Sequence, residues 1–230
     1  MTGTAIGHDP VVQGEVPAEG LRERKKRLLR RQLSDTAARL FLERGFDAVR
    51  VAEVAAACGV SEKTVFNYFP TKEALVLDRL EETEGALRSR LSRPGVSPLE
   101  EAVALLDAEL GALTAALPPA EGRSEAIDAY RRFGDLIRAT PSLRAYRSDM
   151  TDRCVAAVAE VLAGRAGTSP DDPEPQIAAT ALVGLWRVQF HSLRRHLHPD
   201  RTPEQLRAAV AADVRRAAGL IASGLSSFTG

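Results

Sequence analysis

The chain has 230 residues, of which 44% are hydrophobic and 27% are charged, so it can bury a core without disulfide or metal staples. Its formal net charge is zero, but residues 1–20 carry three acids and no base, residues 21–80 a net charge of +5, and residues 81–230 a net charge of −2. A basic module is therefore joined to a slightly acidic one, and this asymmetry is the first indication of function.

Several protein classes are excluded at this stage. Cys58 and Cys154 lie 96 residues apart with no pairing pattern, which excludes a disulfide framework and favours a reducing compartment. No apolar run approaches the ~18 residues of a membrane-spanning helix, and the N-terminus lacks the features of a secretory signal, so we expect a cytoplasmic protein with no membrane partner. Nucleotide, metal and acyl-transfer motifs are absent, and neither the pair His191–His196 nor the pair His196–His198 shares a helical face. We therefore expect no cofactor, no metal site and no catalytic site.

The elements expected after the N-terminus are all helical. Residues 1–20 hold four Gly and two Pro without periodicity and are predicted to form a disordered tail. Beyond them, apolar residues recur at spacings of three and four, which predicts an all-α fold. The first helix is predicted from Leu21 to Arg44 with Gly45 as its C-terminal cap, and a second, short helix over 51–58 stops at Gly59.

Two more helices complete the basic module. Ser61 is the predicted N-cap of a third short helix, Glu62 to Tyr68, which Pro70 ends. Thr71 is expected to cap a fourth helix that runs to about Arg90. After a break at residues 93–98, further helices are predicted at 98–116, 124–139, 142–164, 174–197 and 203–226. We expect a three-helix DNA-binding domain over 21–88 and a helical ligand-binding and dimerisation bundle over 89–230.

The layout of residues 51–69 indicates DNA binding. Two short helices joined by a turn that contains Gly59 form the pattern of a helix-turn-helix, whose second helix enters the major groove. Short helical hairpins also occur as plain packing units. Here, however, the first helix opens with LRERKKRLLRR, which has seven cations and one acid in eleven residues and can contact phosphates or a groove.

The candidate DNA contacts follow from assigning Val60, Val65 and Phe69 to the core. Lys63 and Thr64 are then placed to read base edges, while Tyr68 and Lys72 are predicted to clamp the phosphate backbone. A glutamate at the front of this helix would repel phosphate unless it accepts from a cytosine amino group. The predicted DNA-binding set is Arg24, Lys25, Lys26, Arg50, Ser61, Glu62, Lys63, Thr64, Phe66, Asn67, Tyr68 and Lys72.

The stretch FLERGFDAVRVAEVAAACGVSEKTVFNYFPTKEALV strongly resembles the N-terminal domain of TetR-family transcriptional regulators. The resemblance implies a homodimer that binds a pseudo-palindromic double-stranded operator and is released by a small ligand. One departure concerns Arg50-Val51, which stands where family members usually have a capping Thr: Arg50 can restore the phosphate contact, but the cap is expected to be lost. Residues 133–165 are similar to the ligand domain of mycofactocin-type regulators, which implies a hydrophobic or acyl-CoA-like effector.

The C-terminal half offers candidate ligand and dimer surfaces. Its large side chains either line a pocket or form ordinary core, and Arg187 either holds an anionic ligand or forms a surface ion pair. The pocket candidates are Tyr130, Phe133, Tyr146, Met150, Trp186, Arg187 and Phe190. The 203–226 helix has an apolar stripe and small residues on other faces, so with the 174–197 helix it is expected to form a four-helix dimer seam; completing a monomeric core is the alternative.

The sequence thus predicts a ligand-responsive DNA-binding repressor that is not an enzyme. An activator or an effector-less regulator of the same fold remains an alternative. An all-helical ligand carrier or enzyme, in which the basic module merely packs, is the other alternative.

Overall fold

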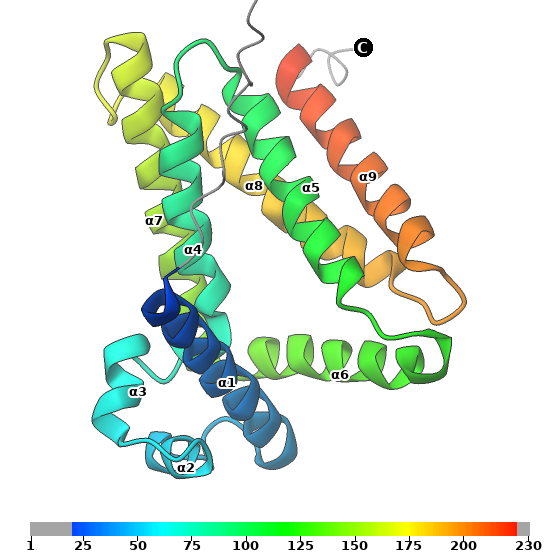
Figure 1. Cartoon of the computed structure of the whole chain (residues 1–230). Coiled ribbons are helices and arrows are strands. Elements are labelled where there is room, and N and C mark those ends of the chain that lie inside the picture. Colours follow the sequence, from blue (N-terminus) through cyan, green and yellow to red (C-terminus); the bar gives the residue numbers. More distant parts are fainter. Residues whose placement is uncertain (1–19, 225–230) are drawn as a thin grey trace, which may run out of the picture.

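A computed structural model describes residues 20–224, apart from the side chains of residues 78–81. Residues 1–19 of the tail predicted over 1–20 and the end of the last predicted helix lie outside the described residues. Throughout the described part the secondary structure is helical, as predicted, and no helix there is long and apolar enough to cross a membrane (Figure 1). The helices are α1 (Leu21–Arg44), α2 (Val51–Ala57), α3 (Glu62–Tyr68), α4 (Ala74–Leu91), α5 (Pro98–Ala115), α6 (Ala120–Ala139), α7 (Pro141–Ala166), α8 (Pro173–His196) and α9 (Pro203–Ser223).

The start of α4 differs from the sequence expectation in an instructive way. The sequence predicted that Thr71 directly precedes this helix. In the structure α4 begins at Ala74, and residues 71–73 form a bend and turn before it. The Thr71 hydroxyl nevertheless accepts a hydrogen bond of 3.1 Å from the backbone N–H of Ala74. The threonine therefore satisfies a backbone donor at the helix start, as expected of a cap. Further along, Leu77 has non-helical angles (φ −113°, ψ 26°) that kink the helix.

A core of aromatic and aliphatic side chains closes the N-terminal module. Helix α1 buries Leu33, Ala37 and Phe41, which recur every fourth residue and so share one helical face. The Phe41 and Phe46 rings lie 5.0 Å apart in a tilted arrangement, and Phe69 at the end of α3 is 1% exposed. These contacts fix α1, α2 and α3 around one centre.

The same core also contains side chains from the middle of the chain. Ile137 at the end of α6 and Leu143 at the start of α7 are buried in it, and Phe133, Leu136 and Tyr146 pack against it. In Figure 1, α6 runs below the lower ends of α5, α8 and α9, and one of its ends lies beside the N-terminal module. The α6–α7 corner is therefore the place where the two predicted domains share a core.

The C-terminal bundle is built from α4, α5, α7, α8 and α9. Helix α7 packs beside α4 and α8, and α9 packs against α8 and α5 (Figure 1). Its interior consists mainly of small and aliphatic side chains, in two clusters: one centred on α7 and α8, and one where α6 and the ends of α5, α8 and α9 meet. Helices with such small side chains can pack closely.

Candidate functional site

A short, internally bonded turn joins α2 to α3. Gly59 adopts φ +68°, a left-handed conformation that glycine tolerates best, and so ends α2. The N–H of Val60 then bonds back to the carbonyl of Ala55 at 3.0 Å. Ser61 begins α3, because its hydroxyl accepts from the backbone N–H of Thr64 at 3.1 Å, as the sequence predicted. The turn therefore holds α3 in a defined orientation to α2.

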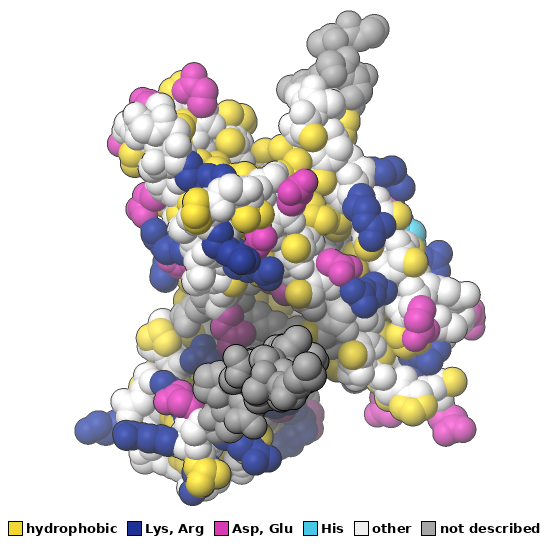
Figure 2. All heavy atoms as spheres, turned by 45° about the horizontal axis from the view of Figure 1, so that its top comes forward, with side chains coloured by type: hydrophobic (Ala, Val, Ile, Leu, Met, Phe, Trp, Pro, Cys, Tyr) yellow, Lys and Arg dark blue, Asp and Glu magenta, His cyan; other side chains and the backbone are white. Residues whose placement is uncertain are grey.

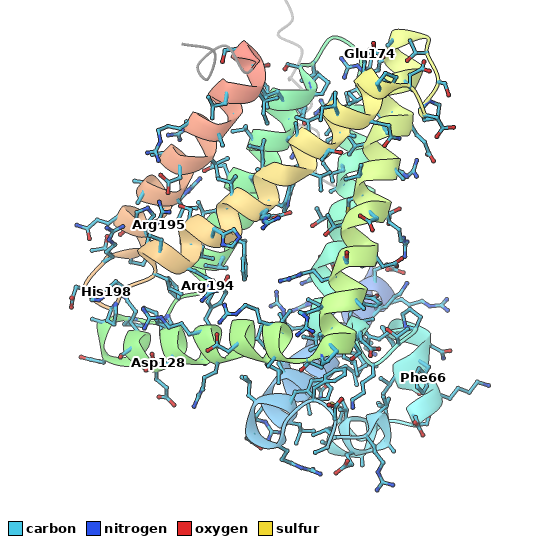
Figure 3. All side chains as sticks on the ribbon, turned by 180° about the vertical axis from the view of Figure 1, so that it is seen from behind. Phe66, Asp128, Glu174, Arg194, Arg195 and His198 are labelled. Atoms are coloured by element: carbon cyan, nitrogen blue, oxygen red, sulfur yellow. The ribbon has the colours of Figure 1, made fainter. Side chains whose placement is uncertain are left out.

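Helix α3 has one buried and one exposed face. Val65 and Phe69 are buried against the module core. Glu62, Lys63 and Asn67 are exposed, and Phe66, 45% exposed, points away from the molecule in Figure 3. These four side chains form the outward surface of a helix of the length and position that a DNA reader requires.

Two of the predicted DNA-contacting side chains are less exposed than the sequence predicted. Thr64 is half-buried, and its hydroxyl lies 2.8 Å from that of Ser61. Tyr68 is half-buried and packs against the module core. The reason is geometric: on a seven-residue helix both lie at the edge between the exposed and the buried face.

Arg30 is a positioning residue that the sequence did not reveal. Its guanidinium donates a hydrogen bond of 3.0 Å to the carbonyl of Tyr68 and lies 4.8 Å from the centre of the Phe69 ring. It therefore satisfies an orphan carbonyl at the end of α3 and ties that helix to α1. The signal in the sequence is its place three residues before the buried Leu33, on the inner side of an otherwise exposed basic run.

Lys72 is also engaged within the chain. Its ammonium donates to the carbonyl of Phe46 at 2.6 Å and lies 4.3 Å from the Phe46 ring centre and 5.6 Å from that of Phe41. Because an ammonium has three donor hydrogens, this bond leaves two for a phosphate. The predicted clamp is thus compatible with the geometry, although Lys72 also has a structural partner.

The expected loss of the side-chain cap at the start of α2 is confirmed, because the side chain of Arg50 makes no capping hydrogen bond. The Arg50 N–H instead donates to the Glu53 carboxylate at 2.8 Å, so Glu53 satisfies a different backbone donor at the start of α2. Arg44 pairs with the same carboxylate at 2.7 Å. The backbone hydrogen bond from Arg50, followed by the one from Arg44, lowers the pKa of Glu53. The Arg50 side chain is 85% exposed and available to a phosphate.

The start of α1 carries the remaining predicted contacts. Arg24, Lys25 and Lys26 are all exposed. Figure 2 shows Lys and Arg side chains at the end of the molecule that α1–α3 form (lower part of the view). A surface of this kind attracts a polyanion over a distance of about a Debye length, roughly 8–10 Å at moderate salt.

The predicted pocket residues do not gather around one cavity. Phe133 and Tyr146 pack against the N-terminal core, Trp186 against the α7–α8 cluster, and Tyr130 against the cluster beside α6. The remaining three are also scattered: Met150 is fully buried, Phe190 stacks edge-on with His191, and Arg187 is exposed in a groove between α8 and α9. Helical periodicity cannot foresee this, because it gives the face of a helix but not its neighbour.

Ser192 and His196 of α8 belong to a polar network centred on Asp213 of α9. The Ser192 hydroxyl donates to the Asp213 carboxylate at 2.7 Å, and His196 Nε2 lies 3.1 Å from the same oxygen. Arg201 lies 2.7 Å from His196 Nδ1. Because an arginine can only donate, it fixes the ring with its proton on Nε2.

This network is not a nucleophile–base pair. The carboxylate lies between Ser192 and His196, so the ring cannot take the serine proton. Burial raises the pKa of the Cys154 thiol to about 11, which removes a second potential nucleophile at neutral pH. Among the described residues, no group of three His, Cys, Asp or Glu side chains is placed to hold a metal ion.

Comparison with known proteins agrees with this architecture. Residues 33–78 match the family of bacterial regulatory proteins called the tetR family, and residues 108–217 match the MftR C-terminal domain. The HTH-type transcriptional regulator TcmR of Streptomyces glaucescens is 29% identical over 174 residues, which cover 74% of this chain and 74% of TcmR. MftR of Mycobacterium tuberculosis is 29% identical over 170 residues, which cover 74% of this chain and 82% of MftR.

A solved structure shares the fold. Native NalD, the secondary repressor of the MexAB-OprM multidrug efflux pump in Pseudomonas aeruginosa, superimposes with a TM-score of 0.50 at 20% identity, covering 83% of this chain and 97% of that chain. The N-terminal match includes the helix-turn-helix described above, and the C-terminal match spans most of the bundle. The chain is therefore a transcriptional regulator of the TetR family, with a helix-turn-helix DNA-binding domain and a C-terminal domain of the MftR type.

Proposed function

We propose that this regulator is a repressor that binds a palindromic operator as a homodimer and is released by a small-molecule effector. The observation that carries the proposal is the exposed face of α3, where Lys63, Phe66 and Asn67 project from a helix that Arg30 holds at its far end. Lysine and asparagine can read base edges, and an exposed aromatic ring can contact a thymine methyl group. One such helix reads few base pairs, so a second copy is needed for specificity.

The outer face of α8 supports the homodimer. Ile177 is 68% exposed, and Gly184 and Val188 lie on the same stripe, spaced by seven and four residues. A side chain added at Gly184 would meet no atom within 4 Å, so this part of the helix has room for another backbone. An apolar and small-residue stripe of this kind suits close approach of a second helix.

The charges at the two ends of α8 support an antiparallel pairing. Glu174 is exposed at one end and Arg195 at the other, and Gly184 lies halfway between them (Figure 3). Pairing of two α8 helices about a two-fold axis near Gly184 would bring each Glu174 toward the partner's Arg195. Helix α9 would add Ala212, which is exposed, to the same seam.

The shared core at the α6–α7 corner supports release by an effector. Ile137 and Leu143 belong to the C-terminal helices but are buried in the core of the DNA-binding module. A ligand that shifts α6 or α7 must therefore move or loosen that core, because packed interiors transmit displacement. This contact gives the effector a physical route to α3.

The test is operator binding by the full chain. A randomised-site selection gives the operator, and fluorescence anisotropy gives its affinity. We expect a palindromic site, two protomers per site, and a steep decrease of affinity with salt. Lys63→Ala is expected to reduce specific binding about five-fold or more, whereas Arg88→Ala, which removes an exposed cation that pairs with Glu160 in the bundle, should leave it unchanged. No selected sequence, or equal effects of both variants, would contradict the proposal.

Repression and release need a second assay. A reporter gene under the selected operator is expected to be silent with the regulator and active without it. Reporter expression that rises with the regulator would instead identify an activator. Increased expression after effector addition would support release.

A further inference from the structure

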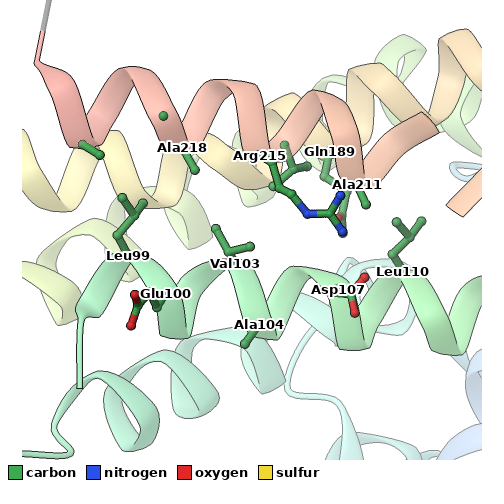
Figure 4. Close-up of a pocket in the computed structure, with 13 residues that line it drawn as sticks. Leu99, Glu100, Val103, Ala104, Asp107, Leu110, Gln189, Ala211, Arg215 and Ala218 are labelled. Atoms are coloured by element: carbon green, nitrogen blue, oxygen red, sulfur yellow. The ribbon is translucent and has the colours of Figure 1, made fainter. Parts of the chain in front are cut away.

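An open groove lies between α5 and α9, on the opposite side of α9 from the α8–α9 groove (Figure 4). Its volume is about 460 Å³, within the range of about 300–1,000 Å³ that small-molecule sites occupy. Its walls are largely apolar. They include Leu99, Val103 and Leu110 from α5 and Val214, Ala218 and Ala222 from α9.

One cation points into this apolar groove. In Figure 4 the side chain of Arg215 extends from α9 toward α5, between Val103 and Asp107. Within the described part of the chain, no hydrogen bond or ion pair engages its guanidinium. The carboxylate of Asp107, which also lines the groove, is bound by Arg207 at 2.7 Å. Glu100 also lines the groove, about two turns of α5 away from Asp107 and next to Leu99 (Figure 4).

We propose that the α5–α9 groove binds an amphipathic organic anion, with the apolar part along α5 and α9 and the acid group on Arg215. A guanidinium next to apolar walls favours such a molecule over a neutral or cationic one, because it forms charge-assisted hydrogen bonds with a carboxylate or sulfonate. The inference rests on the proposed function in one respect: the bound anion is assigned as the effector. Helix α9 contacts both α5 and α8, so a ligand between α5 and α9 acts on the helix pair assigned to the dimer.

The first experiment measures binding to the whole protein without DNA. The probe is anilinonaphthalene sulfonate, an aromatic anion whose fluorescence rises in apolar sites. We expect saturable binding that Arg215→Gln weakens about ten-fold or more and that Arg215→Lys restores in part. The matched control is Arg216→Gln, one residue along α9, where the side chain faces the other groove and pairs with Asp213 at 2.7 Å. Unchanged affinity in Arg215→Gln, or an equal loss in Arg216→Gln, overturns the proposal.

The second experiment tests whether the groove prefers anions and whether it is occupied by a small molecule or by a second copy of the chain. Octanoate is expected to displace the probe at lower concentration than octanol or octylammonium, and equal displacement by all three overturns the anion assignment. Ala222→Trp places a large side chain at one end of the groove, where Ala222 is exposed, and should abolish probe binding while light scattering gives an unchanged mass. A change of mass in this variant would assign the groove to a second copy of the chain and overturn the proposal.

DNA release separates this inference from the proposed function. Release of operator DNA by octanoate in the unmodified protein but not in Arg215→Gln supports both. Release that persists in Arg215→Gln places the effector elsewhere and overturns the groove assignment alone. Arg215-dependent binding without release of DNA supports the groove as an anion site and overturns its effector role.

Discussion

The ammonium of Lys72 donates a hydrogen bond of 2.6 Å to the carbonyl oxygen of Phe46. This contact joins the turn before α4 to the loop after α1, across 26 residues of sequence. It also places the charge over the Phe46 ring, where the aromatic face attracts a cation. A lysine expected to contact DNA thus helps to close the module that presents the DNA-reading helix.

The double role of Lys72 predicts two separable effects. Lys72→Ala is expected to lower the free energy of unfolding by about 1–2 kcal/mol, because the Phe46 carbonyl loses its partner. It should also weaken binding to all DNA sequences and reduce the slope of log affinity against log salt by about one. Denaturant unfolding and anisotropy at several salt concentrations measure the two effects. Lys72→Arg should retain the salt slope, and an unchanged slope in Lys72→Ala would show that no phosphate contact is made.

Arg30 is expected to act through the position of α3. Arg30→Met keeps the apolar stem but removes the hydrogen bond to Tyr68 and the contact with the Phe69 ring, so stability should fall by about 1–2 kcal/mol. Specific operator binding should fall more than binding to unrelated DNA. The control is Arg39→Met on the same helix, whose exposed 3.5 Å pair with Glu43 is expected to contribute under about 0.5 kcal/mol. Equal losses on both kinds of DNA would assign Arg30 to phosphate binding instead.

Lys63 and Glu62 are expected to read bases at the front of α3. Lys63→Ala should cost about 1–3 kcal/mol on the selected operator and relax the preference at one base pair in each half-site, most simply a guanine. Glu62→Gln should tighten binding to all sequences if the carboxylate only repels phosphate, and change the base preference if it accepts from cytosine. A randomised-site selection with each variant measures both, and an unaltered preference profile in Lys63→Ala would rule out the base contact.

The antiparallel α8 pairing predicts a charge-swap result. Glu174→Arg and Arg195→Glu are each expected to weaken the dimer by bringing like charges together, whereas the double variant restores the opposite-charge pairs. Sedimentation equilibrium measures the dimer constant of each variant. Failure of the double variant to recover any affinity would contradict the register about Gly184. Ala212→Glu is the companion test of α9: a helical monomer is expected, and a dimer with full operator affinity would place the interface elsewhere.

Asp213 predicts how stability depends on pH. The hydrogen bond from Ser192, followed by that from His196, holds the pKa of Asp213 below its usual value. A lowered native pKa means that the stabilisation is complete above the unfolded pKa of about 3.9 and is lost as pH falls through the native pKa. Asp213→Asn should therefore be less stable than the unmodified chain at pH 7. This difference should shrink below about pH 4 in denaturant titrations; a constant difference from pH 7 to pH 3 would contradict it.

Much of the DNA-binding module could be predicted from the sequence because its signals are local. Glycine at 45 and 59, serine at 61 and proline at 70 mark helix ends through backbone preferences that hold in any context. The bounds of α1 and α3 agree with the expectation, and the exposed placement of Lys63, Phe66 and Asn67 followed from assigning Val65 and Phe69 to the core.

The last helices show where such reasoning fails. The sequence supported both a dimer seam and a monomeric core for α8 and α9. Leu185 of α8 and Val210 and Val214 of α9, which belong to their apolar faces, are buried within the chain itself, while the small Ala212 and Gly219 lie at its surface. Apolar periodicity gives the buried face of a helix but does not say which element covers it.

The sequence by itself determined that this protein is all-helical, that its N-terminal module has the order of a helix-turn-helix, and which side of α3 is exposed. Only the tertiary structure decided that Arg30 and Lys72 bond to carbonyls 38 and 26 residues away, and that the large aromatic residues lie in three separate clusters. The physical reason is the range of the interactions. Caps and helical faces depend on neighbours within about four residues, whereas a partner for a long charged side chain depends on how distant helices pack.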